Sequence, residues 1–365
     1  MPPIDRRLFQ NFDWMLFGLV LFMVGVGLVN LYSSTSTPAG ISGELRRQLI
    51  SLGIGTVAFV VVVVIDYRHY ERLALPAYLA TTGLLAATLV LAPVTRGSQS
   101  WLFEGRLQPA ELARLAMILM LARWFQRNPP SEVRRLRELW RPGIIVAVPV
   151  GLILAQRDMG VALLTLLVGC SYAALTRIRA RAWAAVALLG IAALATAWFF
   201  VLAPYQRSRI LDVVDPGRDP LASGYQVNQS RIAIGSGGLW GKGWLEGTQT
   251  QLRFLPTQHT DFALSVLAEE WGFVGCMTVL GLYVLLLAWG LVIGRNSKDA
   301  FGAMLAVGIV GALFWPAVLN VGMVVGLAPV IGVPLPFVAY GGSALVSTLV
   351  AVGLLMNVSL RRYVF

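Results

Sequence analysis

Asp261 is the residue best placed for chemistry in this sequence, because it stands alone between a polar segment and a long apolar run. Residues 255–260 read Leu-Pro-Thr-Gln-His-Thr, so His259 and Thr260 place further polar groups beside the acid. A carboxylate in this position can act as a general base. Capping of the helix expected from residue 262 onward is the alternative, although a cap would not require the polar neighbours.

A glycine-rich and basic segment precedes Asp261. Residues 235–243 read Gly-Ser-Gly-Gly-Leu-Trp-Gly-Lys-Gly, a composition that excludes a membrane-spanning helix. Guanidinium groups and the backbone amides of glycine runs both bind pyrophosphate, so this segment is a candidate pyrophosphate site. Contacts with solvent or lipid head groups are the alternative for each of its basic residues, which are Arg207, Arg209, Arg218, Arg231, Lys242 and Arg253.

A polar stripe continues into the apolar run that follows. Asp261, Ser265 and Glu269 are spaced at i, i+4 and i+8, so a helix places them on one face. Glu269 and Glu270 would lie about two turns inside that helix, where a carboxylate must be paired, protonated or hydrated. The stripe predicts a water-accessible cavity, with a structural hydrogen-bond network to a neighbouring helix as an equal alternative.

Two further charged sites lie near expected membrane segments, where charge is costly and usually has a partner or a role. Glu111 and Arg114 are three residues apart at the start of a helix announced by Pro109, so they can form an ion pair. Asp158 lies at a tight turn between two apolar runs and could cap the second one. An ordinary interfacial ion pair and a plain cap are the alternatives to a functional role.

A late polar interruption falls near the end of the chain. Residues 332–337 are apolar but contain two prolines, and Tyr340 is followed by Gly341, Gly342 and Ser343. Irregular backbone at membrane depth is tolerated where it is buried or lines a cavity. The segment is therefore a candidate re-entrant wall of the same site, with a plain hairpin between two spans as the alternative.

The composition predicts an all-α polytopic membrane protein. Hydrophobic residues make up 57% of the chain and charged residues 13%, against about 25% charged residues in soluble domains. A spanning helix needs about 20 apolar residues, and helices satisfy every backbone group in lipid. Ten stretches meet this description, at residues 14–33, 47–65, 73–93, 110–125, 142–157, 159–176, 182–203, 262–293, 301–325 and 343–360.

The arrangement of basic residues predicts the orientation. Arginine and lysine gather before the first span, in alternate connections and after the last span, which places both termini in the cytoplasm. The basic loop 126–141 is then cytoplasmic, and the large connection 204–261, between the seventh and eighth spans, is extracytoplasmic. The formal net charge of +11 follows from this topology, so we expect no nucleic-acid partner. The chain 1–365 is expected to be a single membrane domain.

These motifs, taken in order, resemble the SEDS family of shape, elongation, division and sporulation proteins over essentially the whole chain. The matching passages are residues 105–112, 156–160, 224–226, 229–230, 234–238, 241–243, 255–262 and 334–343. The chain departs from the family pattern in placing Arg114 where lysine is usual. Because arginine does not lose its proton in proteins, a fixed ion pair is favoured over a proton shuttle at this position.

The resemblance implies an enzyme of the cytoplasmic (inner) membrane that polymerises lipid II into glycan strands at the outer face, in the elongation branch of the family. It implies Asp261 as the essential acid and a class B penicillin-binding protein as transpeptidase partner. No resident cofactor is expected, although Mg²⁺ or Mn²⁺ could be held weakly. The candidate substrate-binding residues are Arg106, Glu111, Arg114, Asp158, Arg231, Lys242, His259, Thr260 and Ser343.

The corresponding mechanism gives Asp261 the role of general base. It would take the proton of the acceptor's 4-hydroxyl while that oxygen attacks the donor's anomeric carbon, with inversion. One carboxylate is enough, because undecaprenyl pyrophosphate leaves without being protonated. A lipid II flippase is the main alternative, since many spans and intramembrane acids suit transport. A scaffold that only recruits the transpeptidase would leave the Asp261 cluster without a purpose.

Overall fold

The computed structural model describes most of the chain. The described residues are 12–36, 41–94, 98–103, 105, 107–131, 133, 135–178, 180–196, 199, 204–214 and 224–362. Within these ranges the regular secondary structure is helical, and the bridge residues Ser98, Leu102 and Leu107 form no named strand. This confirms the predicted all-α class.

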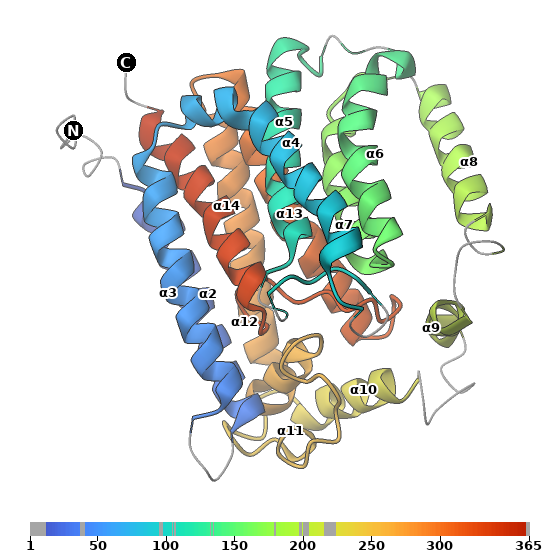
Figure 1. Cartoon of the computed structure of the whole chain (residues 1–365). Helices are drawn as coiled ribbons and strands as arrows, with labels where there is room; N and C mark the ends of the chain where they lie inside the picture. The colour runs from blue at the N-terminus through green and yellow to red at the C-terminus, as the bar shows by residue number, and fades with distance from the viewer. Residues whose placement is uncertain are drawn as a thin grey trace.

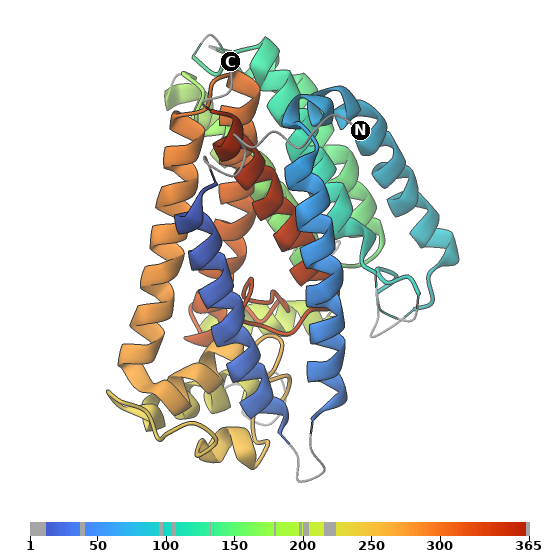
Figure 2. The same ribbon diagram turned by 90° about the vertical axis from the view of Figure 1, so that its left-hand side faces the viewer.

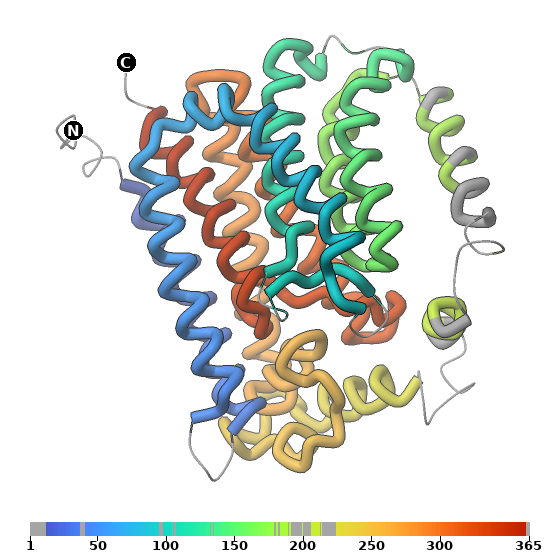
Figure 3. The backbone as a smooth tube through the Cα atoms, in the orientation of Figure 1, coloured from blue at the N-terminus to red at the C-terminus, as the bar shows by residue number. Residues whose placement is uncertain are grey.

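The helices can be followed in chain order from α2 to α14 (Figures 1 and 3). They are α2 (Trp14–Thr35), α3 (Gly43–Val64), α4 (Tyr67–Leu91), α5 (Pro109–Arg127), η1 (Leu136–Leu139), α6 (Trp140–Ala155), α7 (Met159–Ala173), α8 (Ala180–Thr196), α9 (Pro204–Val214), α10 (Tyr225–Gly237), α11 (Thr248–Gln251), α12 (Ala263–Arg295), α13 (Ala300–Val324) and α14 (Gly342–Arg361).

Capping residues explain where several helices begin. The side chains of Asp13, Ser42, Asp66, Asp158 and Asp299 each accept a hydrogen bond from a backbone N–H in the first turn of the next helix. The helix α5 instead begins with a proline, whose missing N–H costs nothing in the first turn.

Seven helical segments in the described chain are long and apolar enough to cross a membrane. They are α2, α3, α4, the run of η1 and α6, α12, α13 and α14. The helix α7 is apolar but shorter, and α5 carries Glu111 and Arg114 in its first turns. The chain is therefore a multi-pass membrane protein, and the count of ten spans stays a prediction.

Both ends of the helical bundle can be followed in the figures. The helix α2 starts and α14 finishes at the same end, where the Asp13 carboxylate accepts a hydrogen bond of 2.8 Å from the Ser359 hydroxyl (Figures 1 and 2). The helices α10 and α11 lie at the opposite end. The helices α10 and α11 thus lie far from the start of α2 and the end of α14, as the predicted topology requires.

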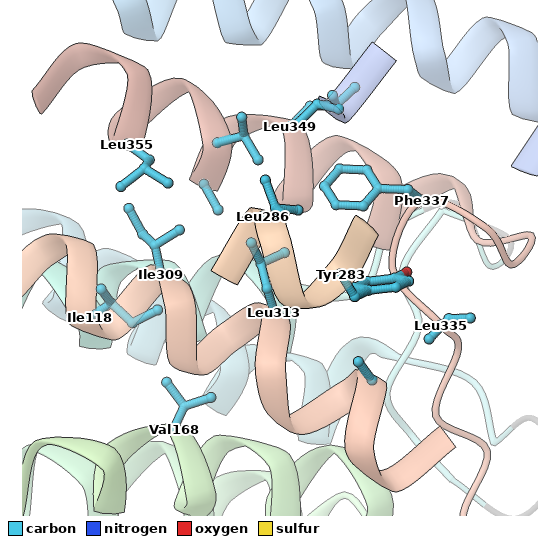
Figure 4. Close-up of a cluster of buried hydrophobic side chains, with 14 of the residues drawn as sticks. Ile118, Val168, Tyr283, Leu286, Ile309, Leu313, Leu335, Phe337, Leu349 and Leu355 are labelled. Carbon is cyan, nitrogen blue, oxygen red and sulfur yellow. The ribbon is translucent and has the colours of Figure 1, made fainter. Parts of the chain in front are cut away.

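The core lies where α12, α13 and α14 meet, with α5 and α7 packed beside them. Figure 4 shows Leu286, Ile309, Leu313, Leu349 and Leu355 side by side, together with Leu335 and Phe337 from the connection between α13 and α14. We call residues 325–341 the late loop. Its apolar side chains enter the core and the Tyr283 hydroxyl donates to the Pro336 carbonyl, so the loop is part of the packed structure.

A break in α12 explains the glycine-rich run. Gly272 interrupts the helix with φ 66° and ψ −165°. Residues 238–243 pack against the break, and the backbone N–H groups of Lys242 and Gly243 donate to the carbonyls of Glu269 and Glu270 at 3.0 and 3.1 Å. Gly241, with φ 83°, lies so close that a Cβ there would collide with the α12 backbone. A membrane helix was excluded here on composition, and the structure supplies the reason for the glycines.

Candidate active site

The acid predicted from the sequence lies in a tight turn just before α12. Asp261 is half-buried, and its N–H donates to the Thr257 carbonyl at 3.2 Å. The same carbonyl accepts from the N–H and the hydroxyl of Thr260, at 3.1 and 3.2 Å. Thr257 has φ 51°, a strained value for a β-branched residue. Strain of this kind is concentrated at functional sites, where the surrounding structure holds it in place.

The late loop lies against this turn. A Cβ placed on Gly332 would lie 3.7 Å from Asp261 Oδ2, so the carboxylate faces that glycine. The His259 ring lies 5.7 Å from the Tyr340 ring at an interplanar angle of 60°, and the His259 carbonyl accepts from the Tyr340 N–H at 2.8 Å. The predicted neighbours of Asp261 therefore share a surface with the late loop.

The late loop also lines a small cavity of about 40 Å³. Glu111 and Arg114 line it as well. Asp261 does not line it; the acid faces Gly332, the residue directly before the lining segment 333–337. The remaining walls come from α7, α13, α14 and the late loop, through Leu164, Ala312, Pro316, Ala344, Leu345, Thr348, residues 333–337, Ala339 and Gly341.

Arg114 is buried at this cavity with part of its guanidinium unpaired. Its Nη1 lies 3.3 Å from Glu111 Oε2, which also accepts a 3.0 Å hydrogen bond from the Ser347 hydroxyl. Within the described part of the chain, Arg114 Nε and Nη2 have no hydrogen-bond partner. A buried donor left without an acceptor is costly, which favours an anionic ligand in the cavity.

The structure gathers further predicted residues at the start of α5. The Gln108 side chain donates to Asp158 Oδ2 at 3.2 Å, and the Gln108 N–H donates to the Ser343 hydroxyl at 3.2 Å. Asp158 also caps α7 through the Val161 N–H at 3.2 Å. Burial raises the pKa of the Asp158 carboxyl, and the hydrogen bond from Val161 opposes that rise. Gln108 thus joins two motifs that lie far apart in the sequence.

Two predicted cations of the polar connection before α12 are engaged by the protein itself. Lys242 Nζ lies 2.7 Å from Glu269 Oε1, and Arg231 donates to the carbonyls of Val325 and Gly326 at 3.1 and 3.3 Å. Their predicted role as pyrophosphate ligands stays a prediction, and it would require them to exchange these partners. Arg106 lies outside the described residues.

Glu269 is held by protein donors instead of water. It is fully buried and accepts hydrogen bonds from Lys242 Nζ, from the N–H groups of Gln249 and Thr250, and from the Thr250 hydroxyl, at 2.7 to 3.0 Å. Of the two interpretations of the polar stripe, the structural network to a neighbouring helix is correct for Glu269, because Gln249 and Thr250 belong to α11. Glu270 is also buried, and its Oε1 accepts from the Ser33 hydroxyl.

Three polar residues of the site were missed in the sequence. Gln108, Ser347 and Asn320 join elements whose contact depends on the tertiary fold. The sequence could have indicated Asn320, because burying a single side-chain amide in an apolar 25-residue helix costs free energy unless the amide is hydrogen-bonded. Within the described ranges, no group of three or more His, Cys, Asp or Glu side chains could hold a metal ion.

A protein-family model described as FTSW_RODA_SPOVE, a cell cycle protein, matches residues 13–363. The chain belongs to the SEDS family. Among SEDS relatives, it is 41% identical to peptidoglycan glycosyltransferase MrdB of Escherichia coli (strain K12), over 88% of this chain and 86% of that protein. It is 31% identical to peptidoglycan glycosyltransferase RodA of Treponema pallidum (strain Nichols), over 97% of this chain and 98% of that one.

Solved structures of SEDS proteins have the same fold. One, from work entitled "Structural coordination of polymerization and crosslinking by a peptidoglycan synthase complex", superposes with a TM-score of 0.80 at 35% identity, covering 97% of this chain and 99% of that chain. The crystal structure of Thermus thermophilus RodA gives a TM-score of 0.72 at 32% identity, covering 96% and 98%. The family resemblance read from the motifs is confirmed.

Replacing Arg114 with alanine is expected to weaken binding of undecaprenyl pyrophosphate to this SEDS protein. A hydrogen bond from a charged donor contributes about 1.5–3 kcal/mol, which corresponds to a Kd raised about 10- to 100-fold. Microscale thermophoresis with the labelled protein in detergent measures this shift. Arg123→Ala, on the same helix, is the matched control and should leave the Kd unchanged. An unchanged Kd in Arg114→Ala would show that the cavity does not bind the pyrophosphate.

Proposed function

We propose that this chain is a peptidoglycan glycosyltransferase that polymerises lipid II into glycan strands, with Asp261 as general base. The observation that carries the proposal is the position of Asp261 against the late loop, which also lines the cavity where, among the described residues, Arg114 Nε and Nη2 have no hydrogen-bond partner. The relatives named peptidoglycan glycosyltransferases support the reaction class. The similarity of this chain to MrdB and RodA favours a role in cell elongation.

The reaction joins two lipid-linked disaccharides. Asp261 takes the proton of the acceptor's GlcNAc 4-hydroxyl as that oxygen bonds to C1 of the donor's MurNAc, and the bond from C1 to the pyrophosphate oxygen breaks. The electron pair leaves with undecaprenyl pyrophosphate, which needs no proton. A single displacement inverts the anomeric carbon. His259 and Thr260, on the same turn, are suited to orient the sugar.

Positive charge is needed to stabilise the negative charge that develops on the leaving pyrophosphate. The buried guanidinium of Arg114 supplies a fixed charge with free donors at the cavity, and the Glu111 carboxylate and Ser347 hydroxyl hold its position. Asp158 and Ser343, joined through Gln108, fix the start of α5 and thereby the direction of this pair. A weakly bound Mg²⁺ or Mn²⁺ would neutralise further pyrophosphate charge.

The setting of the reaction is proposed from the topology. The basic loop 126–141 and both chain ends would face the cytoplasm, and α10 and α11 would lie at the outer face of the cytoplasmic membrane. A class B penicillin-binding protein would crosslink the product. The similarity to a structure from a peptidoglycan synthase complex that coordinates polymerisation with crosslinking supports such a partner.

The proposal is tested with the purified chain, with and without a class B penicillin-binding protein, on labelled lipid II. Glycan polymer on a gel is expected, and chelation with EDTA should slow its formation if Mg²⁺ or Mn²⁺ contributes, with recovery when either ion is returned. Labelled lipid II that crosses the bilayer of proteoliposomes without polymer formation under any of these conditions would favour a flippase.

A further inference from the structure

A single buried amide joins the proposed base to the wall of the cavity. Asn320 lies in α13 and is fully buried. Its Nδ2 donates to the Asp261 carbonyl at 2.9 Å and to the Val333 carbonyl at 2.7 Å. The first carbonyl belongs to the turn that carries the acid, and the second belongs to a late-loop residue that lines the cavity with Arg114.

The two acceptors lie outside the helices, so regular secondary structure does not determine their separation. One nitrogen that donates to both holds the two carbonyls at a fixed distance from each other. The first residue of α12, which directly follows the turn, is held as well, because Asn30 of α2 donates to the Ala263 carbonyl at 2.9 Å. The acid and the cavity wall therefore keep one relative position.

Stability alone gives little reason for an amide at this position. The surrounding helix is apolar, and within the described residues Asn320 Oδ1 is buried without a hydrogen-bond partner. A half-satisfied buried amide loses part of what its two hydrogen bonds contribute, because the orphan acceptor has given up water. Local features that cost stability are expected at functional sites.

We infer that Asn320 is a positioning residue, which holds Asp261 at the distance from the cavity wall that the displacement requires. This inference rests on the proposed role of Asp261 as base. Asn320 contacts backbone carbonyls, so it acts through the turn and the late loop. Because a misplacement of about 1 Å at a reacting group can cost about 10²-fold in rate, loss of this amide should lower the rate far more than its effect on stability suggests.

The test compares Asn320→Leu with Asn357→Leu. Asn357 is also a fully buried asparagine, which donates to the Val62 carbonyl at 2.5 Å and accepts from the Tyr67 N–H at 3.1 Å, but it lies near the end of α14 that adjoins Asp13. The melting temperature, kcat and KM are measured for lipid II polymerisation. We expect Asn320→Leu to lower kcat about 100-fold with little change in KM, and Asn357→Leu to lower only the melting temperature.

Two further variants keep the outcomes distinct. Asn320→Ser retains one donor, should lower kcat by a smaller factor, and replaces Asn320→Leu if the latter does not fold. Ser359→Ala replaces Asn357→Leu under the same condition. A kcat loss in Asn320 variants no greater than in the control, or a loss confined to KM, would overturn the positioning role. Asp261→Asn is run in parallel, and only its retention of activity would overturn the proposed base.

Discussion

Replacing Asp261 with asparagine is expected to lower the rate of glycan polymerisation by about 10²- to 10⁴-fold, the contribution that a general base makes. Asparagine has nearly the same shape as aspartate but cannot accept the hydroxyl proton. The turn should survive the change, because its hydrogen bonds use backbone groups of residue 261 and its neighbours. The Asp261 N–H donates to Thr257, and the side chains of Asn320 and Asn30 donate to the carbonyls of Asp261 and Ala263. The initial rate with fluorescent lipid II, resolved on a gel, measures the effect.

Two controls separate catalysis from folding in this experiment. The melting temperature of Asp261→Asn should equal that of the wild type, since asparagine keeps the shape of the side chain and the backbone hydrogen bonds of the turn are unchanged. Binding of lipid II should also persist, because the base contributes to the transition state more than to the ground state. Loss of binding together with loss of rate would instead make Asp261 a substrate ligand.

Replacing Glu269 with alanine is expected to destabilise residues 238–254, which pack against α12. The buried N–H groups of Gln249 and Thr250 would lose their acceptor, at about 1–3 kcal/mol each, whereas Lys242, whose side chain is 25% exposed, can reach water. The break in α12 depends on the same contact between residues 238–243 and the helix. Thermal unfolding in detergent should show a lower Tm, and limited proteolysis should cut within residues 238–254.

A nearby glutamate offers a matched control for this prediction. Glu246 lies close by in the chain and is exposed, so Glu246→Ala should change stability by no more than about 0.5 kcal/mol. Glu269→Gln keeps the shape of the side chain and should lie between the two. A wild-type Tm and proteolysis pattern in Glu269→Ala would show that Lys242 and the segment are held by other contacts.

Much of the fold could be predicted from the sequence, because the bilayer leaves few choices. Long apolar stretches must form helices there, and the boundaries of α13 and α14 fall within one residue of those expected. Asp261 could be identified for a similar reason. An isolated acid between a polar segment and an apolar helix has few ordinary explanations, and its polar neighbours weaken the simplest of them.

The contacts between motifs could not be predicted in the same way. Whether Lys242 binds a ligand or Glu269 depends on how residues 238–243 pack at the break in α12, which only Gly272 announces. Gln108 joins Asp158 to Ser343 because three separate helix starts meet, a consequence of packing that no local pattern reports. Asn320 carried a signal, but its two acceptors are set by the tertiary fold.

The central claim is that this chain forms the glycosidic bond with Asp261 as the base. The most direct measurement places purified wild type and Asp261→Asn side by side on labelled lipid II, with the transpeptidase partner present. Our account predicts polymer from the wild type and a trace or none from the variant at equal protein. Equal polymer from both would contradict it and leave Asp261 as a structural residue of the turn.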